Sequence, residues 1–227
     1  CGIASVAASL AAPSVRGADS SGADGVVPEL ERIVVTATRL PMRAFDVPAI
    51  VYARSAETVQ LLYQSRTLPE ALGEMTGVMV QKTANGQGSP FMRGYTGFRN
   101  VLLVDGIRLN NSAFREGPNQ YWNTVDPYSL QSVEVLKGTA AVPYGSDAIG
   151  GVVNVITDIA DAGSAGFAPR LLYRYADAES SQTGRAEALY RSDALRARGG
   201  VTYRDYGDVE AGGGTGMQPR TGYDERN

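Results

Sequence analysis

The segment from Val135 to Thr157 reads VLKGTAAVPYGSDAIGGVVNVIT and contains four glycines and one proline between two apolar, β-prone runs. Glycine permits backbone conformations and close approaches that other residues resist. The segment therefore predicts a strand that stops, a chain that turns repeatedly, and a second strand at VVNVIT. What these turns serve depends on the rest of the sequence.

The composition is that of a folded protein with many turns. The 227 residues are 43% apolar and 20% charged, and the 27 glycines lie in short clusters. A net charge of −3 argues against a nucleic-acid partner, which would require clustered Lys and Arg. The chain has no His and one Cys, so it lacks the residues for Ser-His-Asp or Cys-His triads and for Cys/His zinc sites. We therefore expect no catalytic residues and no resident metal.

The N-terminal residues 1–18 are small and apolar as far as Pro13 and resemble the end of a secretory signal, with cleavage expected after Gly17 or Ala18. Cys1 would then belong to a discarded segment, and the alternative is that Cys1 is the lipidated first residue of a lipoprotein. No run of about 18 apolar residues exists. The sequence predicts no transmembrane helix, so any crossing of a membrane would use strands.

Residues 19–30 are rich in Gly, Ser and Asp and predict a flexible arm. The run ERIVVTATR, Glu31 to Arg39, follows this arm and is β-prone. Two interpretations fit the run. It is either an ordinary edge strand or a tethered strand that adds to the sheet edge of a partner, since such pairing requires extended backbone more than particular side chains.

The middle of the chain predicts a small α+β unit. Short helices are expected at Ser55–Gln64 and Thr67–Met75, because Ser55 and Thr67 suit N-caps and Pro69 suits a first helical turn. Strands are expected at Ile50–Tyr52 and Val78–Lys82. In VLLVDGIRLN the pair Asp105-Gly106 is a strong hairpin signal, which makes a structural turn the preferred role for both residues.

The region Asn111–Pro127, NSAFREGPNQYWNTVDP, gathers aromatic and amide side chains without periodicity. Such a loop either binds a small polar ligand or folds onto its own aromatic residues. The candidate ligand-facing residues, with one from the preceding loop, are Phe91, Phe114, Arg115, Tyr121 and Trp122.

Two glycine-rich segments lack the context of nucleotide sites. The G-x-G in Asn85–Asn100 is followed by Pro90 rather than by a helix, and in LKGTAAVPYGS Lys137 precedes Gly138, the reverse of the order in a phosphate-binding loop. We expect neither dinucleotide nor ATP binding.

Four motifs together resemble one family. ERIVVTATR, LPEALGEMTGVMVQK, FMRGYTGFRNVLLVDGIRLN and SVEVLKGTAAVPYGSDAIGGVVNVIT occur in the order found in the plug domains of TonB-dependent outer-membrane receptors, from Glu31 to about Thr157. The resemblance implies an α+β plug domain of mixed sheet and short helices, seated in a transmembrane barrel of about 22 antiparallel strands.

The resemblance also implies roles for particular residues. Residues 31–39 are similar to a TonB box, the strand that the energy-transducing partner TonB pulls, with Ile33, Val34, Val35, Thr36 and Ala37 as the contact residues. Arg93 and Lys137 match the basic positions that pair with barrel carboxylates in the family. Lys137 stands where relatives carry Arg, which keeps the charge but loses the bidentate fork.

The opening segment is then interpreted as a junction, in which glycines turn the chain between the plug and the barrel. These glycines are Gly138, Gly145, Gly150 and Gly151. The plug would span residues 40–160, and residues 161–227 would be the first strands of an incomplete antiparallel transmembrane β-barrel. RLLYRY, GRAEALYRSD and LRARGGVTYRDYGD alternate in the way such strands do.

The implied function is TonB-dependent active import across the outer membrane of a Gram-negative bacterium, without catalysis and without a resident cofactor. The expected cargo is a ferric siderophore, with haem or cobalamin as alternatives. Two other classes stay open at this point. One is a periplasmic or surface binding module. The other is a hydrolase that pairs Asp105 with Glu116 or Asp126, which requires two carboxylates converging in a pocket.

Overall fold

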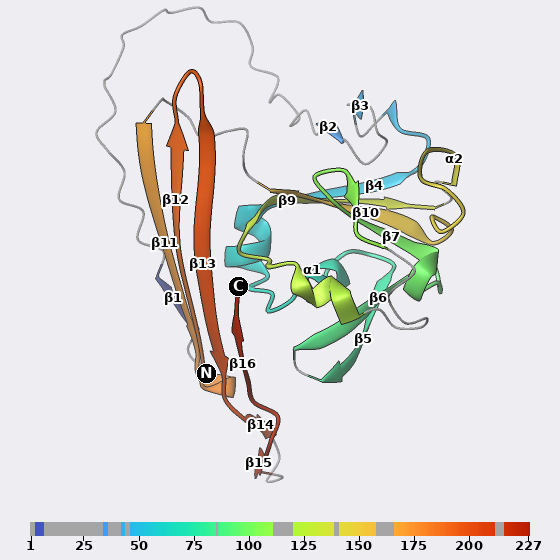
Figure 1. Cartoon of the computed structure of the whole chain (residues 1–227). Coiled ribbons are helices and arrows are strands. Elements are labelled where there is room, and N and C mark those ends of the chain that lie inside the picture. The colour runs from blue at the N-terminus through green and yellow to red at the C-terminus, as the bar shows by residue number, and fades with distance from the viewer. Residues whose placement is uncertain are drawn as a thin grey trace, which may run out of the picture.

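The computed structural model describes residues 3–6, 34–35, 42–43, 46–84, 86–110, 120–138, 141–157, 166–211 and 216–227. Figure 1 shows two bodies side by side, a group of long antiparallel strands and a unit of shorter strands and helices. We call the first the wall sheet (β11, β12, β13 and β16) and the second the plug unit (residues 46–157). The expected α+β unit followed by antiparallel strands is confirmed.

The plug unit is built on a mixed five-stranded sheet in the order β4-β9-β10-β7-β8. Strand β10 runs parallel to β7 and antiparallel to β9, so the chain segments before and after the glycine-rich stretch pair with each other. A separate hairpin is formed by β5 and β6. The strands are β4 (Ile50–Ser55), β5 (Val78–Ala84), β6 (Gln87–Met92), β7 (Asn100–Val104), β8 (Ile107–Arg108), β9 (Leu130–Lys137) and β10 (Gly151–Thr157).

The two predicted helices exist but are shorter than expected. Helix α1 spans Leu68–Gly73, and the Thr67 side chain caps it by accepting a hydrogen bond from the Glu70 backbone N–H at 3.4 Å. The other predicted helix contains η2 (Thr58–Leu62), a π-helical turn. The remaining short helices are η3 (Gly97–Arg99), η4 (Gln120–Thr124), α2 (Ala141–Tyr144) and η5 (Asp177–Glu179).

The central sheet is buried on both faces. Leu102, Val133 and Val153 pack with α1 in one core cluster, whereas Val101 and Val152 point to a second cluster with Tyr144. Neighbouring residues of a strand face opposite sides, so a strand covered on both faces must be apolar throughout. This explains the apolar runs VLLV and VV, whereas the buried Asn154 that follows VV is polar and accepts a hydrogen bond from the Gly106 backbone N–H at 3.1 Å.

The wall sheet consists of β11 (Gly166–Ala176), β12 (Ser181–Arg191), β13 (Arg196–Tyr206) and β16 (Tyr223–Arg226), each antiparallel to the next. The three segments predicted as strands after Thr157 lie in these elements. Shorter pairs are β14 (Val209–Ala211) with β15 (Gly216–Gln218), and β2 (Val34–Val35) with β3 (Met42–Arg43). Strand β1 (Ile3–Val6), within the predicted signal remnant, pairs with β11.

The two faces of the wall sheet differ in a way that is the reverse of a water-soluble sheet. The face away from the plug unit carries exposed apolar side chains that include Phe167, Leu171, Tyr173, Val201 and Tyr203. The face toward the plug unit is polar, as described below. Apolar residues outward and polar residues inward are the pattern of strands in a membrane-spanning sheet. Among the described residues, no helix has the length and apolar character needed to cross a membrane.

The predicted turn residues occupy tight backbone positions. Asp105 and Gly106 have φ of 50° and 77°, and the Asp105 carboxylate accepts bonds from the Thr157 backbone N–H at 2.8 Å and its hydroxyl at 2.7 Å. Gly138 and Gly145 also have positive φ, at 127° and 86°.

Gly150 and Gly151 lie where backbone segments approach closely. A Cβ on Gly150 would stand 2.1 Å from Oδ1 of Asn100, and one on Gly151 would stand 2.7 Å from the Leu136 carbonyl oxygen. The glycine-rich stretch therefore turns the chain and packs it tightly against the ends of β7 and β9.

We predict that Gly150→Ala destabilises the protein by about 1–3 kcal/mol, because the added methyl group must displace Asn100 or the surrounding backbone. Thermal unfolding measures the effect. The matched control is Gly199→Ala in β13, where a Cβ would meet no atom within 4 Å. A Gly150→Ala protein as stable as the Gly199→Ala protein would contradict the close approach.

Candidate functional site

The candidate site is the interface where the inward face of the wall sheet meets the plug unit. Buried polar side chains line this face, although polar residues seldom lie fully buried without partners. They are Ser181, Thr183, Arg185, Glu187, Thr202 and Arg204. Because every second residue of a strand shares a face, the alternation of β12 and β13 brings this set together.

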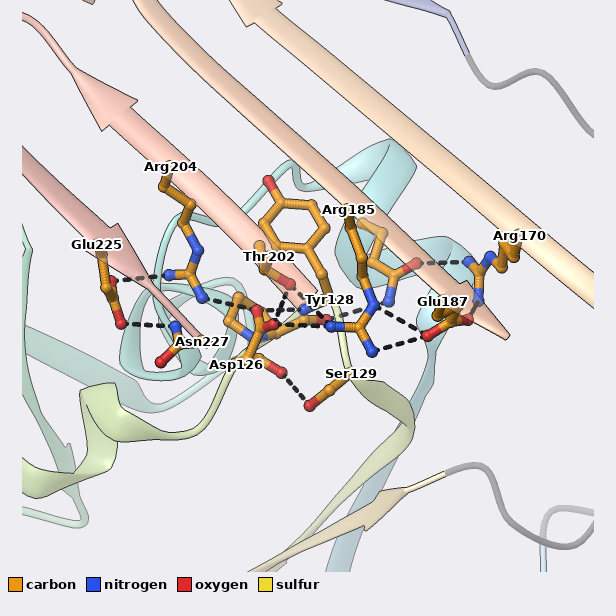
Figure 2. A network of polar contacts seen from close by, with 12 residues as sticks. Asp126, Tyr128, Ser129, Arg170, Arg185, Glu187, Thr202, Arg204, Glu225 and Asn227 are labelled. Carbon is orange, nitrogen blue, oxygen red and sulfur yellow. Dashed lines mark hydrogen bonds and ion pairs between the residues drawn. The ribbon is translucent and has the colours of Figure 1, made fainter. Parts of the chain in front are cut away.

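Asp126 of the plug unit is the centre of the interface (Figure 2). Its Oδ1 accepts a hydrogen bond from Nη2 of Arg204 at 2.6 Å, and its Oδ2 accepts from Nη1 of Arg185 at 3.1 Å and from the Thr202 hydroxyl at 2.6 Å. The Tyr128 backbone N–H also donates to Oδ1, at 3.0 Å. One plug carboxylate thus receives donors from two neighbouring wall strands.

Glu187 of β12 extends the network (Figure 2). Its Oε2 accepts bonds from Arg185 Nη2 at 2.7 Å and Arg198 Nη2 at 2.8 Å, and its side chain is 2% exposed. Arg198 also donates to the Ser129 backbone oxygen at 2.9 Å, and Arg170 reaches Gln60 at 2.8 Å. The arginines of three wall strands therefore each contact the plug unit.

Removing one partner from this network costs more free energy than the intact network contributes to stability. Asp126 is 7% exposed and Arg204 is fully buried, so both have lost much of their hydration. Attraction inside a protein roughly offsets that loss only while every partner is present, and removal of one partner leaves an uncompensated charge. The network therefore holds the plug unit in one register against the wall sheet.

A second ionic group joins the two bodies near the start of α1. Arg66 forms ion pairs with Glu70 and with Glu179 of η5, and Arg174 of β11 reaches Glu179 at 3.4 Å. Lys82 donates to Glu70 at 2.6 Å. Burial raises the pKa of Glu70, but hydrogen bonds from Arg66 and Lys82 outweigh burial and lower the pKa to about 2.

The predicted basic anchors lie elsewhere on the plug unit. Arg93 is exposed, with φ of 54°, and its guanidinium lies next to Gly138. Lys137 donates to the Thr76 backbone oxygen and lies 4.6 Å from the ring centroid of Tyr52. Among the described residues, neither has a carboxylate of the wall sheet as an ion-pair partner.

The five residues predicted to face a ligand divide into three groups. Tyr121 and Trp122 on η4 are 7% and 1% exposed and belong to the core cluster around α1, so both side chains pack into the core of the plug unit. Phe91 on β6 is half-buried. Phe114 and Arg115 lie outside the described residues.

The carboxylates considered for hydrolysis have structural partners. Asp105 is bound to Thr157 in a turn, and Asp126 is bound by two arginines. Glu116 lies outside the described residues. The part of the chain that the structure describes contains no group of three or more His, Cys, Asp or Glu side chains able to hold a metal. Neither Asp105 nor Asp126 is placed as a free acid or base.

A polar pocket of about 770 Å³ lies between the tip of the β5–β6 hairpin, η4 and the segment leading into β16. Its lining is rich in amide, hydroxyl and charged groups, including Gln87, Asn123, Thr124, Arg220 and Glu225. The pocket lies next to the aromatic loop predicted to bind ligand, but its residues were not predicted. The segment Arg220–Glu225 forms one side of the pocket, and local sequence carries no signal for that contact.

The fold and this interface define a plug seated against strands of a membrane-facing sheet. Residues 43–152 match the family described as TonB-dependent Receptor Plug Domain, and they are therefore a plug domain of a TonB-dependent receptor.

Among curated proteins, the chain is 37% identical over 129 residues to the vitamin B12 transporter BtuB of Vibrio cholerae, which covers 56% of this chain and 20% of that protein. It is 31% identical over 132 residues to the rhizobactin receptor of Rhizobium meliloti, covering 58% of this chain and 17% of that protein. The chain thus spans about a fifth of the length of these relatives.

Solved structures support the fold. The ferripyoverdine receptor of the outer membrane of Pseudomonas aeruginosa superposes with a TM-score of 0.61 at 17% identity, over 76% of this chain and 22% of that chain. The copper transporter OprC superposes with a TM-score of 0.62 at 17% identity, over 75% of this chain and 26% of that chain.

We predict that Asp126→Asn lowers the local stability of the plug unit by about 3–5 kcal/mol, because Arg185 and Arg204 stay buried without their counter-charge. Hydrogen–deuterium exchange of β9 and β10 amides in the complete receptor measures this loss. The control is Asp147→Asn, which breaks an exposed pair with Arg108 and should cost about 0–1 kcal/mol. Similar exchange in both variants would refute the special role of Asp126.

We also predict a pH-dependent contribution from Glu70. Because its pKa in the folded protein is lowered from 4.5 to about 2, its stabilising effect is complete above about pH 4.5 and disappears as the pH falls toward 2. Glu70→Gln should therefore reduce stability by about 1–3 kcal/mol at pH 7, and the difference from the unmodified protein should shrink below pH 4.5. Unfolding measured across this range tests the sign, and a constant difference would contradict the assignment.

Proposed function

We propose that the complete protein imports a scarce, polar nutrient across the outer membrane of a Gram-negative bacterium, driven by TonB. The observation that carries the proposal is a plug domain ion-paired to strands whose outward face is apolar. A plug fixed by buried charges blocks a lumen, and a membrane-facing sheet places that lumen in a bilayer. The protein makes and breaks no covalent bond in this function.

The proposed cargo is a ferric siderophore. The pocket beside the β5–β6 hairpin supports this choice, because its amide, hydroxyl and charged groups suit an iron chelate rich in oxygen atoms. Cobalamin is the second candidate, favoured by the 37% identity to the vitamin B12 transporter BtuB. The metal in either case is cargo, and no resident cofactor is proposed.

TonB is the proposed energising partner, together with its inner-membrane complex. Residues 33–37 are the proposed contact segment, of which Val34 and Val35 form strand β2. Ile33, Thr36 and Ala37 lie outside the described residues. A short strand at the end of a segment leading to the plug suits recognition by strand addition.

Arg93 and Lys137 are proposed to contact carboxylates of further strands of the complete protein. Arg93 supports this role because its side chain is exposed. Lys137 donates a hydrogen bond to the Thr76 backbone oxygen within the plug unit. It would pair with a carboxylate of another strand only after giving up that hydrogen bond.

We predict that Val35→Pro in the complete receptor abolishes energised uptake while cargo binding persists, since proline cannot donate to a β-ladder. Uptake of radiolabelled ferric siderophores and of labelled cobalamin by a deletion strain carrying each variant measures this effect. The expected level is that of a strain lacking TonB. Val35→Ile keeps the strand and serves as the control.

The same assay identifies the cargo. Loss of uptake of one ferric siderophore in the deletion strain supports the first candidate, and loss of cobalamin uptake alone supports the second. Unchanged uptake of every chelate and of cobalamin would refute the import function.

A further inference from the structure

Every arginine of the three long wall strands lies on the inward face of the sheet. Alternate residues of a strand share a face, and the strand register puts these arginines in the same set of positions as the buried Arg185 and Arg204. Within these three strands, all of whose residues the structure describes, Glu187 is the only carboxylate on that face. We call these seven residues the arginine ladder: Arg170 and Arg174 of β11, Arg185 and Arg191 of β12, and Arg196, Arg198 and Arg204 of β13.

The arginine ladder is continuous along the strands. Rows of the sheet that share a face are about 7 Å apart, so five successive rows extend over roughly 27 Å, close to the thickness of about 30 Å of a bilayer's hydrocarbon layer. At one end, Arg204 forms an ion pair of 3.1 Å with Glu225, which lines the proposed cargo pocket. Each of the five rows contains at least one ladder arginine, and the rows are those of Arg191, Leu189, Glu187, Arg185 and Thr183 on β12.

The plug unit covers the arginine ladder with little negative charge. Among the described residues, Asp126 is the only plug carboxylate that pairs with ladder arginines. On the plug side, Arg198 and Arg170 bind uncharged oxygens, a backbone carbonyl and a side-chain amide (Figure 2). The other carboxylates that pair with the ladder belong to the wall sheet and its η5 turn, and they are Glu179, Glu187 and Glu225. A plug unit that withdrew would leave seven arginines facing three carboxylates.

The stability of the sheet does not account for the end of the ladder away from the pocket. Arg191 and Arg196 lie directly opposite each other on β12 and β13, and like charges in that position destabilise a sheet. Arg196 is exposed, and no carboxylate of the described residues forms an ion pair with it. Two facing cations at the end of a continuous cationic row favour the attraction of an anion.

We propose that the arginine ladder lines the path of import when the plug unit moves, and that it selects metal chelates of net negative charge. The inference rests on the proposed function and names the class of its cargo. A cleft lined by charges of one sign raises the local concentration of oppositely charged molecules by about 10- to 1000-fold. Guanidinium groups also bind paired oxygen anions through two parallel hydrogen bonds, which suits a chelate rich in anionic oxygens. A neutral cargo such as cyanocobalamin would gain little from these residues.

The test uses the complete receptor in the deletion strain and measures surface binding and TonB-driven uptake separately. The anionic probes are a ferric tris-catecholate and a ferric hydroxycarboxylate, and the neutral probes are a ferric trihydroxamate and cyanocobalamin. Import of an anionic probe in preference to the neutral ones is expected. Preference for a neutral probe would overturn this proposal and leave the import function standing, whereas import of none of the probes would refute both.

Arg196→Gln is the discriminating variant, because Arg196 lies outside the Asp126 network and at the end of the ladder away from the cargo pocket. It should lower the maximal uptake rate of the anionic chelate about threefold, and Arg196→Glu about tenfold, with surface affinity unchanged. The matched control is Arg196→Lys, which keeps the charge and should keep the uptake.

Thermal stability separates this role from a structural one. Removing the repulsion between Arg196 and Arg191 should leave the receptor as stable as before or more stable, whereas a residue needed for folding would lower stability. If the Arg196 variants do not reach the membrane, Arg191→Gln removes a charge from the same row. Unchanged uptake in Arg196→Glu, or an equal loss of uptake in Arg196→Lys and Arg196→Gln, would overturn the proposal.

Discussion

The structure depends on how the charges that point inward from the wall sheet are compensated. The side chains of Arg185 and Arg204 project from neighbouring strands on the same face and converge on the Asp126 carboxylate of the plug unit. Each charge is stable in its buried place only because the others are there. The plug unit and the wall sheet therefore determine each other's position, and a shift of one residue in either strand would turn these arginines to the other face.

The same sheet meets two environments. Its inward side chains need hydrogen-bond partners from the plug unit. Its outward side chains are mostly apolar, with Gln182, Asp205, Asp224 and Arg226 gathered at one end. The two requirements are met by alternate residues of the same strands, so β12 and β13 are polar at every second position without being water-soluble on either side. A plug domain beside such a sheet is consistent with transport rather than with a self-contained binding module.

Short-range sequence signals were sufficient to predict most of the helices, strands and turns of the plug unit. Asp105-Gly106 predicted its hairpin because few residue pairs accept positive φ, and Thr67 with Pro69 predicted the start of α1. The burial of Trp122 and the pairing of Asp126 could not be predicted in this way. Both depend on residues far away in the chain, and an Asp followed by Pro reads locally as an ordinary turn. The motifs at Arg93 and Lys137 predicted basic plug residues that pair with carboxylates of the strands. The observed ion pairs have the opposite arrangement, with the Asp126 carboxylate on the plug unit and the arginines on the wall sheet.

The sequence by itself determined the class of the plug, the positions of its strands and turns, and the alternation of the strands that follow, because each depends on residue type and short-range spacing. Only the tertiary structure decided which polar residues meet. Arg204 contacts Asp126 and the backbone oxygen of Arg66, which are distant in sequence, and strand register brings them within hydrogen-bond distance. Register is a property of paired strands, so no single segment could reveal it.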